Sequence, residues 1–201
     1  MSSGVVKGLK DKAEKTWTNT KRLLAFMSVW GLIFSLVTIS HLGVAFDYDD
    51  TLVNSGAAYS KAFASASQAY SPQFWAVVNQ SYDLEKPKLI VYPLAWLFRV
   101  FGFRIAVITA RPAIEADPLK KEWRHLVSRG NFFFGADGGA KHQHLQSGNF
   151  VLFFGDSDTD IEEARKARVF PIRIRRSPKS LYKDDYHPGT FGELVIPFSE
   201  Y

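Results

Sequence analysis

The 201-residue sequence contains no cysteine. This absence excludes disulfide bonds, thiolate metal sites and a cysteine nucleophile. It leaves the compartment open, because many exported proteins also lack cysteine. The sequence has no internal repeat and no low-complexity linker. Apolar residues make up 46% and charged residues 22% of the chain, which excludes global disorder and allows one packed domain.

Charge is missing altogether from residues 23–40, which read LLAFMSVWGLIFSLVTIS. An uncharged run of 18 residues is at the lower limit for a membrane span. Lys21 and Arg22 before it are typical of a signal sequence or a signal anchor. A membrane helix that ended at Ser40, however, would leave almost no linker before the next strand. We therefore favour an apolar helix docked on the domain or in a subunit interface, with a membrane anchor and a cleaved signal as the alternatives.

Basic residues gather in two regions. Residues 1–22 hold six Lys or Arg against two acidic residues, without strong periodicity, which is typical of a tail or a frayed helix. Residues 165–183 hold eight Lys or Arg. A solvated surface is the simplest interpretation of this second run, and attraction of anionic substrates or membrane headgroups is the alternative. No motif indicates a nucleic-acid partner, and we expect none.

A cluster of carboxylates follows the first apolar run. The stretch LGVAFDYDDTLV, residues 42–53, leads from a predicted buried strand into Asp47 and Asp49. Crowded carboxylates at a strand end repel one another and lose hydration. A divalent cation is the usual compensator, and hard oxygen ligands suit Mg²⁺. The stretch therefore predicts a phosphoryl-transfer site with Asp47 as the nucleophile.

Short apolar runs without alternation are interleaved with helical segments through the rest of the chain. This pattern predicts an α/β fold with a parallel sheet covered by helices on both faces. A helical cap of about 54–103 is inserted after the carboxylate motif. Further strands are expected at 103–109, 131–134, 150–154 and 169–174, and helices at 56–69, 89–102, 113–129, 140–147 and 160–167, with another beginning at Ser71-Pro72.

The two carboxylates of the first motif suit the two halves of ester hydrolysis. A carboxylate nucleophile such as Asp47 divides the reaction into two steps through an aspartyl-phosphate. The leaving alcohol then needs a proton, and the attacking water must later lose one. Asp49, two residues further on, can do both as a general acid and then a general base.

Polar residues at other predicted strand ends can supply the remaining parts, because ligands of parallel sheets gather at the carboxyl ends of strands. Thr109 and Arg111 can donate to phosphoryl oxygens, and Lys141 offers a further cation. Asp156 can complete the metal site, and Asp160 can brace Asp156 or Lys141. Each residue alone has an ordinary structural explanation as a cap, a turn or a surface group. Their order at successive strand ends favours function.

These motifs resemble those of a known superfamily. FDYDDTL, ITAR, Lys141 and GDSDTD are similar to the four motifs of the haloacid dehalogenase (HAD) superfamily of aspartate-nucleophile phosphatases. SPQFW, FFGDSDTDIEEAR and PIRIRRSPKSLY resemble class B bacterial acid phosphatases, and the resemblance covers 27–201. It implies a HAD-like catalytic domain at 41–201 that hydrolyses small phosphomonoesters, including nucleotides, with Mg²⁺. A phosphotransferase or another hydrolase of this fold is the alternative.

The same resemblance assigns residues to roles. It implies that Asp47, Asp156 and the backbone carbonyl of Asp49 bind Mg²⁺. It implies that Thr109, Ala110 and Lys141 hold phosphate, and that an aromatic pocket stacks a base or an aryl leaving group; this pocket consists of Tyr59, Trp75 and Tyr182. It also implies a homotetramer in the periplasm or at a membrane. A helix 23–40 that is merely docked indicates a cytoplasmic enzyme instead.

Overall fold

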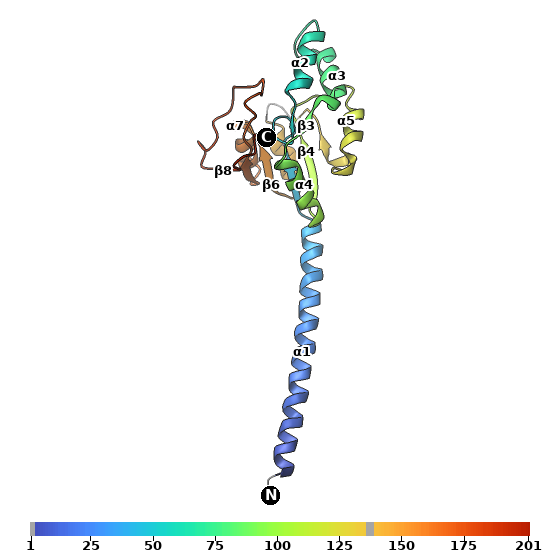
Figure 1. Ribbon diagram of the computed structural model, residues 1–201, viewed down its shortest axis with the longest axis vertical. Helices are drawn as coiled ribbons and strands as arrows, with labels where there is room; N and C mark the ends of the chain where they lie inside the picture. Colours follow the sequence, from blue (N-terminus) through green and yellow to red (C-terminus); the bar gives the residue numbers. More distant parts are fainter. Residues whose placement is uncertain (1–2, 136–138) are drawn as a thin grey trace. The chain divides into compact units, whose positions relative to one another are not determined.

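The computed structural model describes residues 3–135 and 139–201 as two compact units, Met1–Ser40 and His41–Tyr201. The first unit is a single helix, α1 (Ser3–Ser40) (Figure 1). One helix thus covers both the apolar segment and the basic segment, for which a tail and a frayed helix were the two expectations. No proline interrupts residues 1–40, so nothing in the sequence ends the helix between them. Residues 1–2 of the expected tail lie outside the described residues.

The second unit is built on a parallel sheet of six strands in the order β5-β4-β1-β6-β7-β8. Strand β1 lies inside the sheet between β4 and β6, and its residues are all buried, which explains the unbroken apolar run. The parallel sheet is therefore confirmed. Its strands are β1 (Gly43–Phe46), β4 (Arg104–Ile108), β5 (Phe132–Phe133), β6 (Phe150–Gly155), β7 (Phe170–Arg173) and β8 (Leu194–Val195).

Helices cover both faces of this sheet. On one face, Phe46 of β1 shares a buried cluster with Val91 and Leu119; on the other, Ala45 shares a cluster with Leu145 and Ala164. The two-sided cover predicted from the sequence is confirmed. The α-helices of this unit are α2 (Gly56–Ser65), α3 (Pro72–Gln80), α4 (Val91–Val100), α5 (Asp117–Glu122), α6 (Lys141–Ser147) and α7 (Asp158–Lys166), and the 3₁₀ turns are Tyr82–Leu84, Trp123–His125 and Arg129–Asn131.

The expected cap divides into two parts. Helices α2 and α3 stand beyond the sheet in Figure 1, joined to it by a small antiparallel pair, β2 (Val53–Asn54) and β3 (Lys86–Pro87). Helix α4 instead packs its Val91 and Ala95 into the main core. Within the segment 54–103, α2 and α3 thus lie apart from the sheet, whereas the apolar face of α4 belongs to the main core.

The helix expected at 113–129 is shorter than predicted. Asn79 of α3 donates its side-chain Nδ2 to the carbonyl oxygens of Pro112 and Ile114, at 3.1 and 2.7 Å. Glu115 adopts a positive φ of 49°. Both features keep residues 112–116 out of a helix, and α5 begins only at Asp117. Trp123 is buried.

Candidate active site

Asp47 directly follows β1, at the carboxyl end of the sheet's inner strand. Its backbone N–H continues the ladder by donating to the carbonyl oxygen of Phe154 at 2.8 Å. The chain then turns back, because the N–H groups of Leu52 and Val53 both donate to the carbonyl oxygen of Tyr48. This turn presents Asp49, Asp50 and Thr51 beside Asp47.

The structure brings the predicted site residues together around a cavity of about 340 Å³. Only Thr109 is missing from its described lining. Thr109 is buried at the end of β4, and its hydroxyl accepts a hydrogen bond from the backbone N–H of Arg111 at 3.2 Å. The predicted residues that line the cavity are Asp47, Asp49, Tyr59, Trp75, Ala110, Arg111, Lys141, Asp156, Asp160 and Tyr182.

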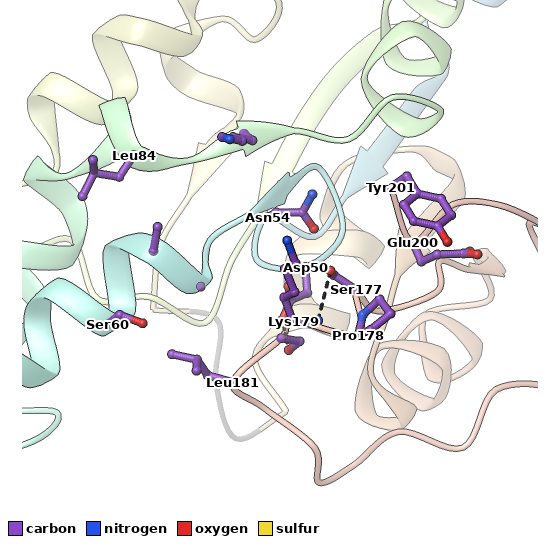
Figure 2. A pocket seen from close by; sticks show the side chains of 14 residues that line it. Asp50, Asn54, Ser60, Leu84, Ser177, Pro178, Lys179, Leu181, Glu200 and Tyr201 are labelled. Carbon is purple, nitrogen blue, oxygen red and sulfur yellow. Dashed lines mark hydrogen bonds between the residues drawn. The ribbon is translucent and has the colours of Figure 1, made fainter.

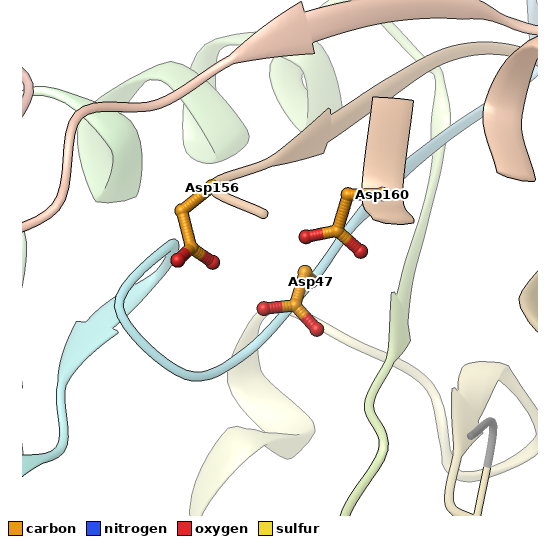
Figure 3. Close-up of side chains that lie close together, drawn as sticks. All are labelled: Asp47, Asp156 and Asp160. Carbon is orange, nitrogen blue, oxygen red and sulfur yellow. The ribbon is translucent and has the colours of Figure 1, made fainter. Parts of the chain in front are cut away.

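Three of these carboxylates face one another in Figure 3. Asp47 follows β1, Asp156 follows β6, and Asp160 lies in the first turn of α7; one oxygen from each lies within 4.8 Å of the others. Lys141, from the start of α6, donates to Asp47 Oδ1 at 2.7 Å and to Asp160 Oδ1 at 2.6 Å. Asp160 thus braces Lys141, one of the two roles considered from the sequence.

Burial dominates the electrostatics of this group. It raises the pKa of Asp47 well above its usual value; Lys141 lowers that pKa, while Asp160 and Asp156 raise it further. Burial likewise raises the pKa of Asp156. Burial alone would lower the pKa of Lys141, but the carboxylates of Asp160 and Asp47 raise it above its ordinary range. Lys141 is therefore a fixed cation beside Asp47.

Arg111 is bound to two acidic residues and fully buried. Its Nε and Nη2 donate to the two carboxylate oxygens of Asp49 at 2.8 and 2.5 Å, which is a bidentate pair. Nη2 also donates to Glu85 Oε1 at 2.5 Å. Glu85 in turn accepts from the hydroxyl of Tyr48 at 2.5 Å, and Trp123 Nε1 donates to that hydroxyl at 2.9 Å. Sequence reasoning missed Glu85.

A second residue that sequence reasoning missed is Arg176, which forms an ion pair with Asp156 Oδ2. The other oxygen of Asp156 accepts from the Thr51 hydroxyl at 3.0 Å. Arg176 belongs to the basic run 165–183, for which a solvated surface was the simplest interpretation. That interpretation is wrong for Arg176, whose side chain is largely buried, and for Arg173, which is fully buried. The basic run itself contains no local signal that singles out Arg176, because its partner Asp156 lies 20 residues away.

The buried charges of the site do not balance. The site brings six acidic side chains together with four basic ones. The acidic residues are Asp47, Asp49, Asp50, Glu85, Asp156 and Asp160, and the basic residues are Lys88, Arg111, Lys141 and Arg176. With all six carboxyl groups ionised, the group would carry an excess of two negative charges, which one divalent cation would neutralise. The oxygen donors of Asp47 and Asp156 are also the type that Mg²⁺ prefers. The residues present therefore fit a divalent metal.

Aromatic side chains form one wall of the same cavity. The ring of Tyr59 lies 6.0 Å from that of Trp75 and 5.3 Å from that of Tyr182, both edge-on. Tyr70, which the sequence did not single out as a site residue, joins the wall. The Arg111 guanidinium lies 5.4 Å from the Tyr59 ring centre. The structure thus brings together all three residues of the expected aromatic pocket.

A larger cavity of about 540 Å³ adjoins the site (Figure 2). Its lining comes from α2, from the β2–β3 pair, from residues 177–181 and from Glu200 and Tyr201. Asp50 lines both cavities, and Ser180 donates a hydrogen bond to the Asp50 carboxylate. None of the residues predicted for chemistry lies in its described lining.

Solved structures with a similar fold are phosphoryl-transfer proteins and hydrolases. A predicted phosphoglycolate phosphatase from Haemophilus somnus aligns with a TM-score of 0.55 at 17% identity, over 79% of this chain and 95% of that one. A putative haloacid dehalogenase-like hydrolase from Bacteroides fragilis aligns with a TM-score of 0.50 at 12% identity, over 77% and 96%. At these identities the likeness shows the fold alone, which is that of the HAD superfamily.

Curated proteins similar in sequence are class B acid phosphatases. The protein from Klebsiella pneumoniae is 33% identical over 190 residues, covering 88% of this chain and 80% of that protein. The protein from Citrobacter rodentium is 33% identical with the same coverage. No protein-family model matches the chain. The identity and coverage show that this chain belongs to the class B acid phosphatases, phosphoric monoester hydrolases on the HAD fold.

Proposed function

We propose that the protein is a Mg²⁺-dependent acid phosphatase that hydrolyses small phosphomonoesters through an aspartyl-phosphate on Asp47. The observation that carries the proposal is the buried carboxylate of Asp47 at the end of β1, with the Lys141 ammonium 2.7 Å away. Asp47 and Asp156, with the backbone carbonyl of Asp49, would hold the metal. When bound, a divalent cation withdraws charge from the phosphoryl oxygens.

The reaction begins when an oxygen of Asp47 attacks phosphorus and the bond to the leaving alcohol breaks. To act as the acid, Asp49 must carry a proton on one oxygen, which requires one of its two hydrogen bonds from Arg111 to open. It gives that proton to the alcohol and then takes one from the water that hydrolyses the aspartyl-phosphate. Lys141 stabilises the charge on the phosphoryl oxygens, and the backbone N–H groups after Thr109 donate to them. The nucleophile Asp47 and the acid/base Asp49, which act in both steps, lie on the same turn after β1.

Arg111 is proposed to contact the substrate while it holds Asp49. Its Nε and Nη2 are bonded to Asp49 and Glu85, but its buried Nη1 has no hydrogen-bond partner among residues 3–135 and 139–201. A buried donor without an acceptor costs about 1–3 kcal/mol. Arg111 lines the cavity, and a phosphate oxygen that reached Nη1 would satisfy it.

The aromatic wall is the reason to propose phosphomonoesters with a flat leaving group as substrates. Tyr59, Trp75 and Tyr182 line the same cavity as Asp47, so a base or an aryl ring can stack there while phosphate reaches the nucleophile. Nucleoside monophosphates and aryl phosphates have this form.

The test is turnover of p-nitrophenyl phosphate and of a nucleoside monophosphate by Asp47→Asn. The substitution keeps the shape of the side chain but removes the nucleophile. We expect kcat to fall by at least about 10³-fold. Asp83→Asn, at an exposed position, is the matched control and should retain full activity. Retained turnover in Asp47→Asn would rule out the covalent route.

Phosphotransfer is the second candidate, because an alcohol can replace water in the second step. An added alcohol acceptor distinguishes the two reactions. Hydrolysis releases one phosphate for each p-nitrophenol, whereas transfer releases more p-nitrophenol than phosphate. Without acceptor, we expect phosphate and p-nitrophenol to be released in equal amounts. With acceptor, an excess of p-nitrophenol over phosphate would assign transfer.

A further inference from the structure

Helix α1 is apolar on every side over its second half. The large apolar side chains from Leu23 to Val37 are each between 43% and 73% exposed on the helix. Successive residues point 100° apart, so these side chains surround the helix axis. A helix docked on a water-soluble domain keeps one polar face toward water. No charged residue lies in 23–40 to form such a face.

Hydroxyl groups in this part of α1 are bonded within the helix. Ser28 Oγ donates to the carbonyl oxygen of Leu24 and Thr38 Oγ1 to that of Phe34, both at 2.8 Å. Water would satisfy these hydroxyls without any such bond. Hydrocarbon offers no partner, so polar groups there must be satisfied within the helix. Ser65, an exposed residue of helix α2, makes the same bond to the Lys61 carbonyl oxygen, so the bonds of Ser28 and Thr38 are compatible with lipid and do not by themselves require it.

Length and linker also fit a bilayer. The segment Thr16–Thr38 is long and apolar enough to cross a membrane; as a helix its 23 residues extend about 34 Å, against about 30 Å of hydrocarbon. Four residues, 39–42, separate it from Gly43, the start of β1, and the first two of them still belong to α1. Two helical and two extended residues reach about 10 Å, which is enough to pass a headgroup layer of roughly 5–8 Å. The short linker is thus compatible with a span.

Charge is strongly asymmetric along α1 and its flank. Residues 1–15 contain four Lys, Lys21 and Arg22 lie near the amino end of the segment, and residues 23–60 contain no Lys or Arg. Lys21 Nζ lies 5.1 Å from the ring centre of Trp17, which places an aromatic and a cation at the basic end. Basic residues stay on the cytoplasmic side of a membrane, and Trp favours the interface. The basic end is therefore the cytoplasmic one.

We propose that α1 is a retained membrane anchor, with residues 1–15 in the cytoplasm and the unit His41–Tyr201 on the opposite side of the bilayer. The occupant of the apolar face of α1 is lipid. Taken with the proposed function, this topology means that the enzyme acts on phosphomonoesters outside the cytoplasm. The experiments below measure insertion and topology rather than activity, so they can fail independently of the proposed function.

Membrane extraction of the full-length chain, expressed in a bacterium, tests the anchor. We expect the intact chain, with its amino-terminal segment present, to stay in the membrane pellet after alkaline carbonate and to be released by detergent. Release by carbonate, or a soluble product that lacks residues 1–40, would overturn the proposal. Trp30→Lys with Phe34→Lys should move most of the chain out of the pellet, since charges at the centre of a span are costly. The control, Trp30→Leu with Phe34→Leu, should remain there.

Cysteine labelling tests the orientation without background, because the chain has no cysteine of its own. Ser3→Cys marks the basic end, and Lys121→Cys marks an exposed position of α5. In intact spheroplasts, a membrane-impermeant maleimide should label Lys121→Cys and reach Ser3→Cys only after lysis. The reverse pattern, or labelling of both before lysis, would overturn the proposed topology.

Discussion

Arg111 is the buried residue that connects the site to the core. Its guanidinium lies between the carboxylates of Asp49 and Glu85 and 4.8 Å from the ring centre of Tyr48. Burial lowers the pKa of Arg111, but the charges of Asp49 and Glu85 raise it well above its usual value. Glu85 therefore supports the proposed acid/base through Arg111, as a positioning residue.

Replacing Glu85 by Gln tests this role. The substitution keeps the volume but removes the charge that holds Nη2, so Arg111 loses one of its two anchors. Charge-assisted hydrogen bonds are worth about 1.5–3 kcal/mol, and we expect a fall in kcat of about tenfold or more with little change in KM. The measurement is the separate kcat and KM on p-nitrophenyl phosphate. Glu122→Gln, at an exposed position, should leave both unchanged, and an equal kcat in the two variants would contradict the positioning role.

Residues of the site differ in how far the sequence could predict them. Asp47 and Asp156 were predictable, because polar residues after apolar runs meet at one edge of a parallel sheet. Lys141, the first residue of α6, was predictable only from its place in the order of motifs. Glu85 and Arg176 were not: their ion-pair partners lie 26 and 20 residues away, and no local pattern announces such pairs.

At the scale of elements, the start of α7 orients the cation of the site. Ser157 and Asp160 form a capping box, in which Ser157 Oγ accepts from the Asp160 N–H at 3.0 Å and Asp160 Oδ2 accepts from the Ser157 N–H at 3.1 Å. The remaining oxygen of Asp160 holds Lys141. The cap is therefore also a support for Lys141.

Gly155, the last residue of β6, makes this arrangement possible because it has no side chain, so the Asp160 side chain can lie against its backbone. A Cβ at Gly155 would lie 2.4 Å from Cβ of Asp160, so Gly155→Ala must displace Asp160. We expect kcat to fall by tenfold or more, and the free energy of unfolding to fall by about 1–3 kcal/mol. Gly130→Ala is the matched control, because a Cβ there meets nothing within 4 Å. Activity assays and urea denaturation measure the two effects; parent-like activity in Gly155→Ala would show that Asp160 does not support Lys141.

Elements with strong local patterns were predictable, and elements set by distant contacts were not. The apolar runs of β1, β4 and β6 have the length and burial that a parallel strand requires. The two-residue strands β2, β3 and β8 carry no such signal. The delayed start of α5 depends on Asn79, more than 30 residues earlier, which binds the preceding carbonyls.

At the scale of the whole molecule, the catalytic unit has a buried charge imbalance that folding alone does not resolve. Burial raises the pKa of Asp47 and Asp156, and it raises the pKa of Asp50 to about 6. These shifts mean that the ionised carboxylates cost free energy in the folded state. A divalent cation that binds only the folded unit would offset that cost and stabilise the protein as a whole.

Thermal unfolding of the detergent-solubilised, full-length chain measures this stabilisation. At Mg²⁺ concentrations about 100 times Kd, binding adds about 2.7 kcal/mol, which raises Tm by roughly 5–10 °C for a chain of this size. EDTA should reverse the shift. Asp156→Asn removes one proposed ligand, so its Mg²⁺-dependent shift should be nearly lost, whatever its Tm without metal. Asp117→Asn, an exposed control, should keep the full shift. Equal shifts in the two variants would mean that the ion binds elsewhere, and the excess charge at the end of β1 would then need another partner.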